Sequence, residues 1–152
     1  MKDWVRATAI AALVSGIPST VHAIMTNQDP LAPTKAAGKL ALPKEHRTPH
    51  LLAAAIPTHL AISLAWGYAI SRTKNPTTTR GALAGLAIAT LDLHLPGKRL
   101  APVRSLPKAP QLADHIAFGA TVGWLLKKQP PPVSKRQERQ MRQKRNAGQS
   151  RE

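Results

Sequence analysis

The sequence contains no cysteine and only seven acidic residues, and aromatic side chains make up 3% of it. The missing cysteine excludes disulfides, thiolate metal sites and cysteine nucleophiles. The shortage of aromatic side chains disfavours a soluble globular core, because most of the apolar content then comes from alanine and leucine. Such small side chains suit helices that pack closely in a bilayer. The composition therefore favours a membrane protein, and 152 residues are enough for one domain.

Basic residues greatly outnumber acidic ones, and they give the chain a formal net charge of +15. A charge of this size is also typical of nucleic-acid-binding proteins. Here, however, the basic residues flank apolar runs or gather in the C-terminal stretch "KKQPPPVSKRQERQMRQKRNAGQSRE", which has no aromatic side chain on which a base could stack. This distribution is typical of membrane topology signals. Nucleic-acid binding is kept only as an alternative.

Four apolar segments predict membrane spans, and they lie at about residues 4–25, 50–70, 77–95 and 109–126. A helix needs about 20 apolar residues to cross the hydrocarbon core of a bilayer. Prolines are concentrated between these segments, where they predict helix ends and turns. We therefore predict an all-α fold, a four-helix transmembrane bundle at residues 1–128, with a disordered basic C-terminal tail at 129–152.

Two segments allow a second interpretation. The start "MKDWVR", followed by an apolar stretch and "VHA", resembles a signal peptide, although Asp3 and Pro18 weigh against cleavage. The connector "LAPTKAAGKLALP" at residues 31–43 fits either a short interfacial helix or an ordered loop.

An even number of spans puts both termini on the same side of the membrane. The basic tail favours the cytoplasmic side, and so predicts a multi-pass protein of the bacterial cell inner membrane. Basic residues close to a bilayer surface are attracted to anionic lipid headgroups. We expect such headgroup contacts from Lys127, Lys128, Lys135 and Arg136.

Ionisable residues interrupt the predicted spans. Each costs about 2.5–3.5 kcal/mol at the centre of a spanning helix, and less near its ends or when paired. In a four-span topology most of them fall in one leaflet, where they either fix the bundle by hydrogen bonds or form a binding or proton-handling site. This candidate polar cluster comprises His22, His59, Asp92, His94, Asp114 and His115.

The stretch "LDLHLPG" gives the sharpest local prediction. Pro96 disfavours helix at the residue before it, and Gly97 permits a sharp change of direction, so together they predict the end of the third helix. Asp92 has a short side chain that cannot reach far towards water. We therefore expect it to face the bundle and to pair with His115 or His22.

Small residues recur four positions apart in the last two spans, at Gly81 and Gly85 and again at Gly119 and Gly123. Residues with this spacing lie on one helix face, where missing side chains let two backbones approach closely. The spacing predicts helix packing within one bundle, with a seam between two copies of the chain as the alternative.

No catalytic motif is present: the chain has no phosphate-binding glycine loop and no GxSxG, and its histidines lack the HExxH spacing of a zinc site. The sequence predicts no cofactor and no bound metal. We interpret the chain as a non-enzymatic accessory or interaction component of the membrane, whose partners are lipids and other membrane subunits or itself. The alternative is a small transporter or proton-linked channel that uses the Asp/His cluster.

The stretches "WVRATAIAALVSGIPSTVHAI", "HLAISLAWG", "GLAIATLDL" and "PQLADHIAFGATVG" together resemble small uncharacterised bacterial inner-membrane proteins with four predicted helices. The resemblance covers roughly Trp4–Leu126. Its most specific element is Asp114 and His115 followed by Phe118 and Gly119. It implies architecture and location only, and carries over no catalytic residue.

Overall fold

The computed structural model describes residues 3–99 and 101–127, and for residues 94–99 and 101–102 it gives the backbone alone. Within these ranges the chain is helical and has no strand, so the predicted all-α class is confirmed. The helices are α1 (Asp3–Val14), α2 (Ile17–Met25), α3 (Ala32–Ala41), α4 (Thr48–Ser71), α5 (Thr78–Arg99), α6 (Ala101–Arg104) and α7 (Lys108–Lys127). The tail at 129–152, with Lys128, Lys135 and Arg136, lies outside the described residues.

The first apolar segment forms two helices rather than one. Helix α1 ends at Val14 and α2 begins at Ile17, with a turn at Ser15 and Gly16 between them. Pro18 stands in the first turn of α2, where its missing N–H costs no helical hydrogen bond. The break therefore falls just before the proline that the sequence marks, and it exposes the start of a new helix within the apolar segment.

Helix α5 and helix α7 pack backbone to backbone through their glycines. A Cβ added at Gly81 would overlap the carbonyl oxygen of Gly119, and one added at Gly85 would overlap that of His115. On the other helix, Cβ atoms at Gly119 and Gly123 would meet backbone atoms of Gly81 and Thr77. The two glycine stripes thus face each other inside a single chain.

The connector at residues 31–43 is a helix, which resolves the alternative left open by its sequence. Helix α3 packs on α4, and its Gly38 lies directly against the backbone of Leu51. Two prolines of the chain sit at helix starts in this region, Pro33 in α3 and Pro49 in α4. Pro57 lies inside α4, which continues past it to Ser71.

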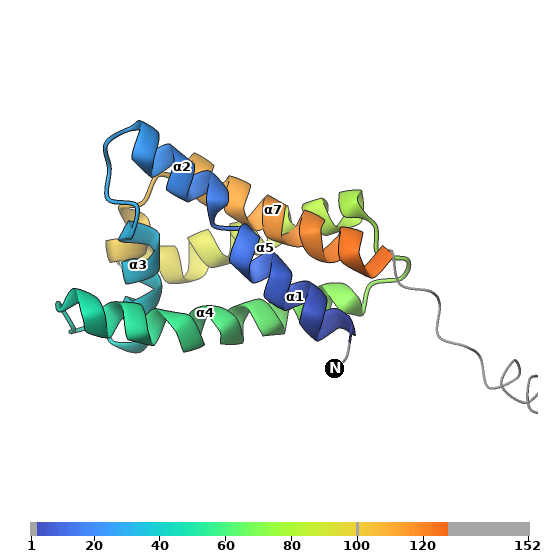
Figure 1. Cartoon of the computed structure of the whole chain (residues 1–152), viewed down its shortest axis with the longest axis horizontal. Helices are drawn as coiled ribbons and strands as arrows, with labels where there is room; N and C mark the ends of the chain where they lie inside the picture. Colours follow the sequence, from blue (N-terminus) through green and yellow to red (C-terminus); the bar gives the residue numbers. More distant parts are fainter. Residues whose placement is uncertain (1–2, 100, 128–152) are drawn as a thin grey trace, which may run out of the picture.

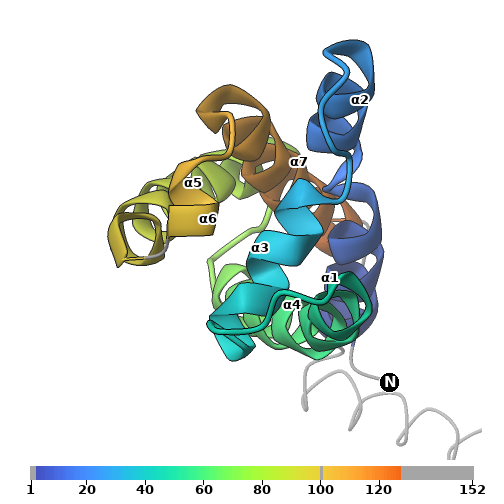
Figure 2. The ribbon, with the colours of Figure 1, turned by 90° about the vertical axis from the view of Figure 1, so that its left-hand side faces the viewer.

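The long helices run back and forth along one direction (Figure 1). Helix α1 with α2 leads away from the N-terminus, α4 returns, α5 leads away again and α7 returns, so that the C-terminal end of α7 lies at the same end as the N-terminus. Helix α7 contacts α1, α2, α4 and α5. Figure 2 views the molecule from the end opposite the N-terminus. Helix α3 lies across this end, between α4 and the connection that leads from α2 to α3.

The prediction that Pro96 and Gly97 end the third helix is wrong, because α5 continues to Arg99. A proline removes only the hydrogen bond to the carbonyl four residues earlier, here that of Asp92, and the bonds on either side can still hold a helix. At the other end of α5, Arg80 donates to the carbonyl oxygens of Lys74 and Asn75 at 2.7 and 3.1 Å. Its charge therefore lies at the loop before the helix.

The buried residues are mostly apolar, but several large apolar side chains lie on the surface. The buried set includes the hydroxyl side chains of Thr8, Ser15, Ser19 and Ser63, while Leu13 and Met25 are 82% and 78% exposed. Two stretches of the described chain, Asp3–Met25 and Thr48–Ser71, are long and apolar enough to cross a membrane, and most of each stays outside the protein core. By length and composition these two stretches are candidate membrane spans.

Candidate functional site

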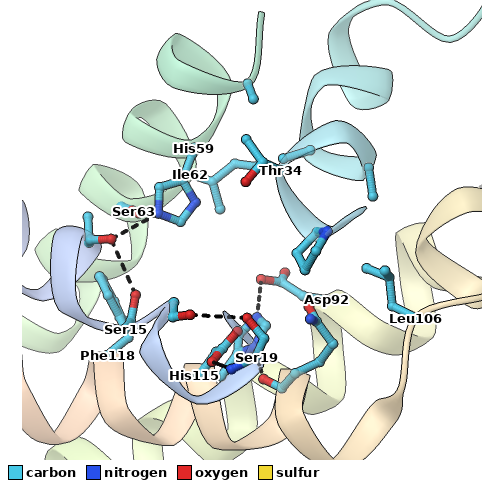
Figure 3. A pocket seen from close by; sticks show the side chains of 18 of the residues that line it. Ser15, Ser19, Thr34, His59, Ile62, Ser63, Asp92, Leu106, His115 and Phe118 are labelled. Carbon is cyan, nitrogen blue, oxygen red and sulfur yellow. Dashed lines mark hydrogen bonds and ion pairs between the residues drawn. The ribbon is translucent and has the colours of Figure 1, made fainter. Parts of the chain in front are cut away.

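A cavity of about 460 Å³ lies between the helices (Figure 3). Residues of α1, α2, α3, α4, α5 and α7 all contribute to its wall. Most of the wall is apolar, with Ile56, Ile62 and Phe118 among the larger side chains. Its polar groups include Ser15, Ser19, Thr34, His59, Ser63, Asp92, Asp114 and His115. Ligand pockets generally have a volume of about 300–1,000 Å³ and combine apolar walls with a few polar groups in this way.

Asp92 is held from two sides at the cavity wall. Its Oδ2 accepts a hydrogen bond of 3.2 Å from the indole Nε1–H of Trp66, on α4, and lies 3.4 Å from Nε2 of His115, on α7. One carboxylate oxygen thus links three helices. The predicted pairing of Asp92 with His115 inside the bundle is confirmed by these contacts.

The hydrogen bonds of His115 define where its protons lie. Its Nδ1 is 2.7 Å from the backbone carbonyl oxygen of Gln111, which can only accept, so Nδ1 carries a hydrogen. If His115 were neutral and Asp92 ionised, the lone pair of Nε2 would then face a carboxylate oxygen, which is repulsive. The contact is favourable only when one more proton lies on His115 or on Asp92. The contact geometry therefore fits a pair that shares one proton and has no net charge.

Asp114 caps the start of α2, at the break between α1 and α2. Its Oδ1 accepts a 2.9 Å hydrogen bond from the backbone N–H of Ser19, in the first turn of α2. The first N–H groups of a helix have no partner within the helix, and a nearby carboxylate satisfies them and favours the helix dipole. This contact explains why an aspartate stands near the start of an otherwise apolar segment: it caps a helix that begins inside the protein.

His59 closes another part of the cavity wall. Its Nε2 lies 3.3 Å from the carbonyl oxygen of Ala12, at the end of α1, and Figure 3 shows its ring directed into the cavity from α4. The hydroxyl groups of Ser15 and Ser19 donate to the carbonyl oxygens of Ala12 and Gly16. These serines thus donate to the backbone rather than to an imidazole.

The structure brings together four of the six residues in the predicted polar cluster. His59, Asp92, Asp114 and His115 line the cavity, whereas His22 lies beside a separate hollow of about 20 Å³. The side chain of His94 is outside the described part of the structure. Among the residues described, no group of three or more His, Asp or Glu side chains is placed to hold a metal ion.

Trp66 and the three serines of the wall were not among the predicted site residues. A signal for Trp66 was present in the sequence, because an indole N–H in an apolar span needs an acceptor and Asp92 in another span needs a donor. The serines gave no such signal, since a serine in a spanning helix commonly bonds its own backbone.

A second polar group lies outside the apolar segments, in the loop before α4. Glu45 accepts hydrogen bonds from the backbone N–H groups of Arg47 and His46, each at 2.9 Å, and its other oxygen lies 2.9 Å from Nδ1 of His50. The backbone N–H of Arg47 is the largest cause that lowers the pKa of Glu45 far below its usual value, followed by the side chains of Arg47 and His50. This carboxylate orders the entry into α4.

Comparison of the chain with protein-family models, with curated proteins and with solved structures gives no match. The functional argument therefore depends on the cavity and the residues around it.

Proposed function

We propose that this chain is a small multi-pass integral membrane protein that binds a small molecule inside its helical bundle. The observation that carries the proposal is the cavity of about 460 Å³, into which His59, Asp92, Asp114 and His115 converge from three helices. Ionisable groups within membrane segments face a bundle interior and generally mark a binding site or a proton pathway.

The proposed spans are α1 with α2, α4, α5 and α7. Only the first two of these pass a test of length and hydropathy. Helices α5 and α7 are less apolar because they carry the glycines of their mutual contact and the polar residues of the cavity. Both kinds of residue face inward, while Leu83 and Leu86 of α5 are exposed and available to lipid.

The order of the helices supports the same topology. Because the four helices alternate in direction, the N-terminus and the end of α7 lie at the same end of the molecule (Figure 1). Helix α3 lies across the opposite end, where an interfacial helix would lie. By the excess of basic residues in the C-terminal tail, we assign the side of the termini to the cytoplasm. We also keep the proposal of a bacterial inner-membrane location.

The cavity favours ligand binding, and with it a transport role, over the accessory role that the absence of catalytic motifs suggests. A helix bundle that serves only as a partner for other subunits needs no pocket lined by ionisable side chains. Four titratable side chains around the cavity carry a cost, which is offset only in part by their mutual contacts.

A cysteine-labelling experiment tests the proposed cavity, because the native chain has no cysteine to interfere. Ser63 is buried at the cavity wall, and Thr8 is buried away from it against Gly67. With the protein in liposomes, Ser63→Cys should react with a small maleimide and Thr8→Cys should not. Equal protection of both variants would contradict an accessible cavity. Recovery of the wild-type chain from cells in the soluble fraction without detergent would contradict the membrane location.

A further inference from the structure

The charged residues of the cavity point to one class of ligand. The chain has 22 lysine and arginine residues, yet none of them is among the described residues that line the cavity. The titratable side chains there are two carboxylates, Asp92 and Asp114, and two imidazoles, His59 and His115. Among the described residues, the wall therefore holds carboxylates and no lysine or arginine, which suits a positively charged ligand and disfavours an anion.

The remaining wall adds to this preference. The hydroxyl groups of Ser15 and Ser19 donate to the carbonyl oxygens of Ala12 and Gly16, so their hydrogens are already used and their oxygens can act only as acceptors. The aromatic rings of Trp66 and Phe118 also line the cavity, and aromatic faces attract cations. Apolar side chains supply most of the surface, so a small inorganic cation would leave most of the space unfilled.

We propose that the cavity binds an amphipathic organic monocation, and that this cation takes the place of the proton held between Asp92 and His115. This inference rests on the proposed function, and names the ligand class and the exchanged ion. One cation enters and one proton leaves to solvent, so that Asp92 remains as a carboxylate beside the cation and His115 remains a neutral imidazole. The net charge of the cavity is the same before and after, which avoids a large electrostatic cost in an apolar surrounding.

Exchange of one proton for one cation predicts that the affinity for the cation depends on pH. The groups of the described structure that face the Asp92–His115 pair are Trp66 on α4 and, around the cavity, His59 and Asp114. Where the pair is protonated, competition with one proton makes the dissociation constant of the cation fall about tenfold for each unit that pH rises.

Two probes of matching shape and opposite charge test the proposal: tetraphenylphosphonium, whose charge does not change with pH, and tetraphenylborate. Binding is measured by equilibrium dialysis with the full chain in lipid nanodiscs, after subtraction of protein-free nanodiscs. We expect saturable binding of the phosphonium ion only, weakened at least tenfold by Asp92→Asn and unchanged by Asp3→Asn, which removes an exposed carboxylate remote from the cavity. The wild-type protein should release about one proton per cation in weakly buffered solution, a result that needs no variant to fold.

The outcomes separate this inference from the proposed function. Saturable binding of tetraphenylborate as tight as that of the phosphonium ion would overturn the cation assignment and leave a ligand cavity. Cation binding without proton release would overturn the exchange. If neither probe binds while Ser63→Cys still reacts with maleimide, the ligand class is wrong but the cavity stands. If neither probe binds and Ser63→Cys is protected, both proposals fail.

Discussion

Two interfaces of this molecule use small residues in opposite ways. Between α5 and α7, glycines remove the side chains, and the two backbones touch at Gly81, Gly85 and Gly119. Between α1, α4 and the other side of α7, small residues such as Ala12, Ala55 and Ser63 face a cavity of about 460 Å³. The first interface is closed by its small residues, and the second is left open by them.

The difference follows from what lies beside the small residues. At the glycines of the α5–α7 contact no side chain separates the two backbones, and the pair Asp92–His115 joins the same two helices at the cavity wall. On the open side, Trp66, Asp92 and His115 meet across three helices, and Asp114 joins α7 to α2. These polar links set the distances between helices. The closed interface therefore gives rigidity, and the open one gives a place for a ligand.

Changing Gly119 should have the largest effect on stability. A Cβ at this position overlaps the backbone of Gly81 and Gly85, which cannot move aside as a flexible side chain would. We expect Gly119→Val to destabilise the protein by at least about 3 kcal/mol or to prevent folding. Thermal unfolding in detergent, followed by circular dichroism, measures the effect. Gly16→Ala is the matched control, because nothing lies within 4 Å of its added Cβ; equal losses would contradict the closed interface.

Removing the indole N–H of Trp66 should destabilise the contacts between the helices around the cavity. Trp66→Phe keeps an aromatic ring but leaves Asp92 without the hydrogen bond from Nε1. Hydrogen bonds to ionisable groups are worth about 1.5–3 kcal/mol, so we expect a loss of about 2 kcal/mol in the same unfolding assay. Trp4→Phe, which keeps the ring contact with Tyr68, should lose less. A larger loss at Trp4 would show that the contact with Asp92 does not hold the helices.

The cap at Asp114 should matter through its oxygen rather than its charge. Asp114→Ala removes the acceptor for the N–H of Ser19 and should cost about 1 kcal/mol, the usual value for a lost N-terminal cap. Asp114→Asn retains an acceptor oxygen and should cost clearly less. Similar unfolding free energies for the two variants would contradict the assigned cap.

The smallest effect is expected at the loop before α4, where Glu45 has a lowered pKa. A carboxylate with a lowered folded-state pKa stabilises the protein above its unfolded pKa of about 4.3, and this contribution is lost progressively as pH falls below that value. We therefore expect the unfolding temperature to fall between about pH 5 and pH 3, and Glu45→Gln to reduce that fall. An unchanged pH profile in the variant would contradict the role of Glu45.

The sequence placed the apolar helical stretches, because apolar runs bounded by prolines depend on local chemistry, but it missed the division of the first into α1 and α2. It named His115 and His22 as partners for Asp92, and the structure pairs Asp92 with His115. It did not predict the cavity or the role of Trp66, because both depend on how each helix is rotated. Helix α4 is apolar on nearly all sides, and its composition does not show that Ser63 and Trp66 face inward.

Other differences have equally local causes. His22, the other partner predicted for Asp92, lies beyond the break at Ser15 and Gly16 and lines a separate hollow. Pro96 failed to end α5 because the preference of the residue before a proline is a tendency that the rest of a helix can override.

The central claim is that the helices cross a bilayer with the cavity inside. Helix α5 tests this claim most directly, because its hydropathy alone does not mark it as a membrane span. Leu83, on α5, is 61% exposed and should face lipid. A spin label on Leu83→Cys in liposomes should collide often with dissolved oxygen and rarely with a water-soluble nickel complex, whereas a label on Arg72→Cys in the preceding loop should show the reverse. Nickel accessibility at position 83 equal to that at position 72 would contradict the account.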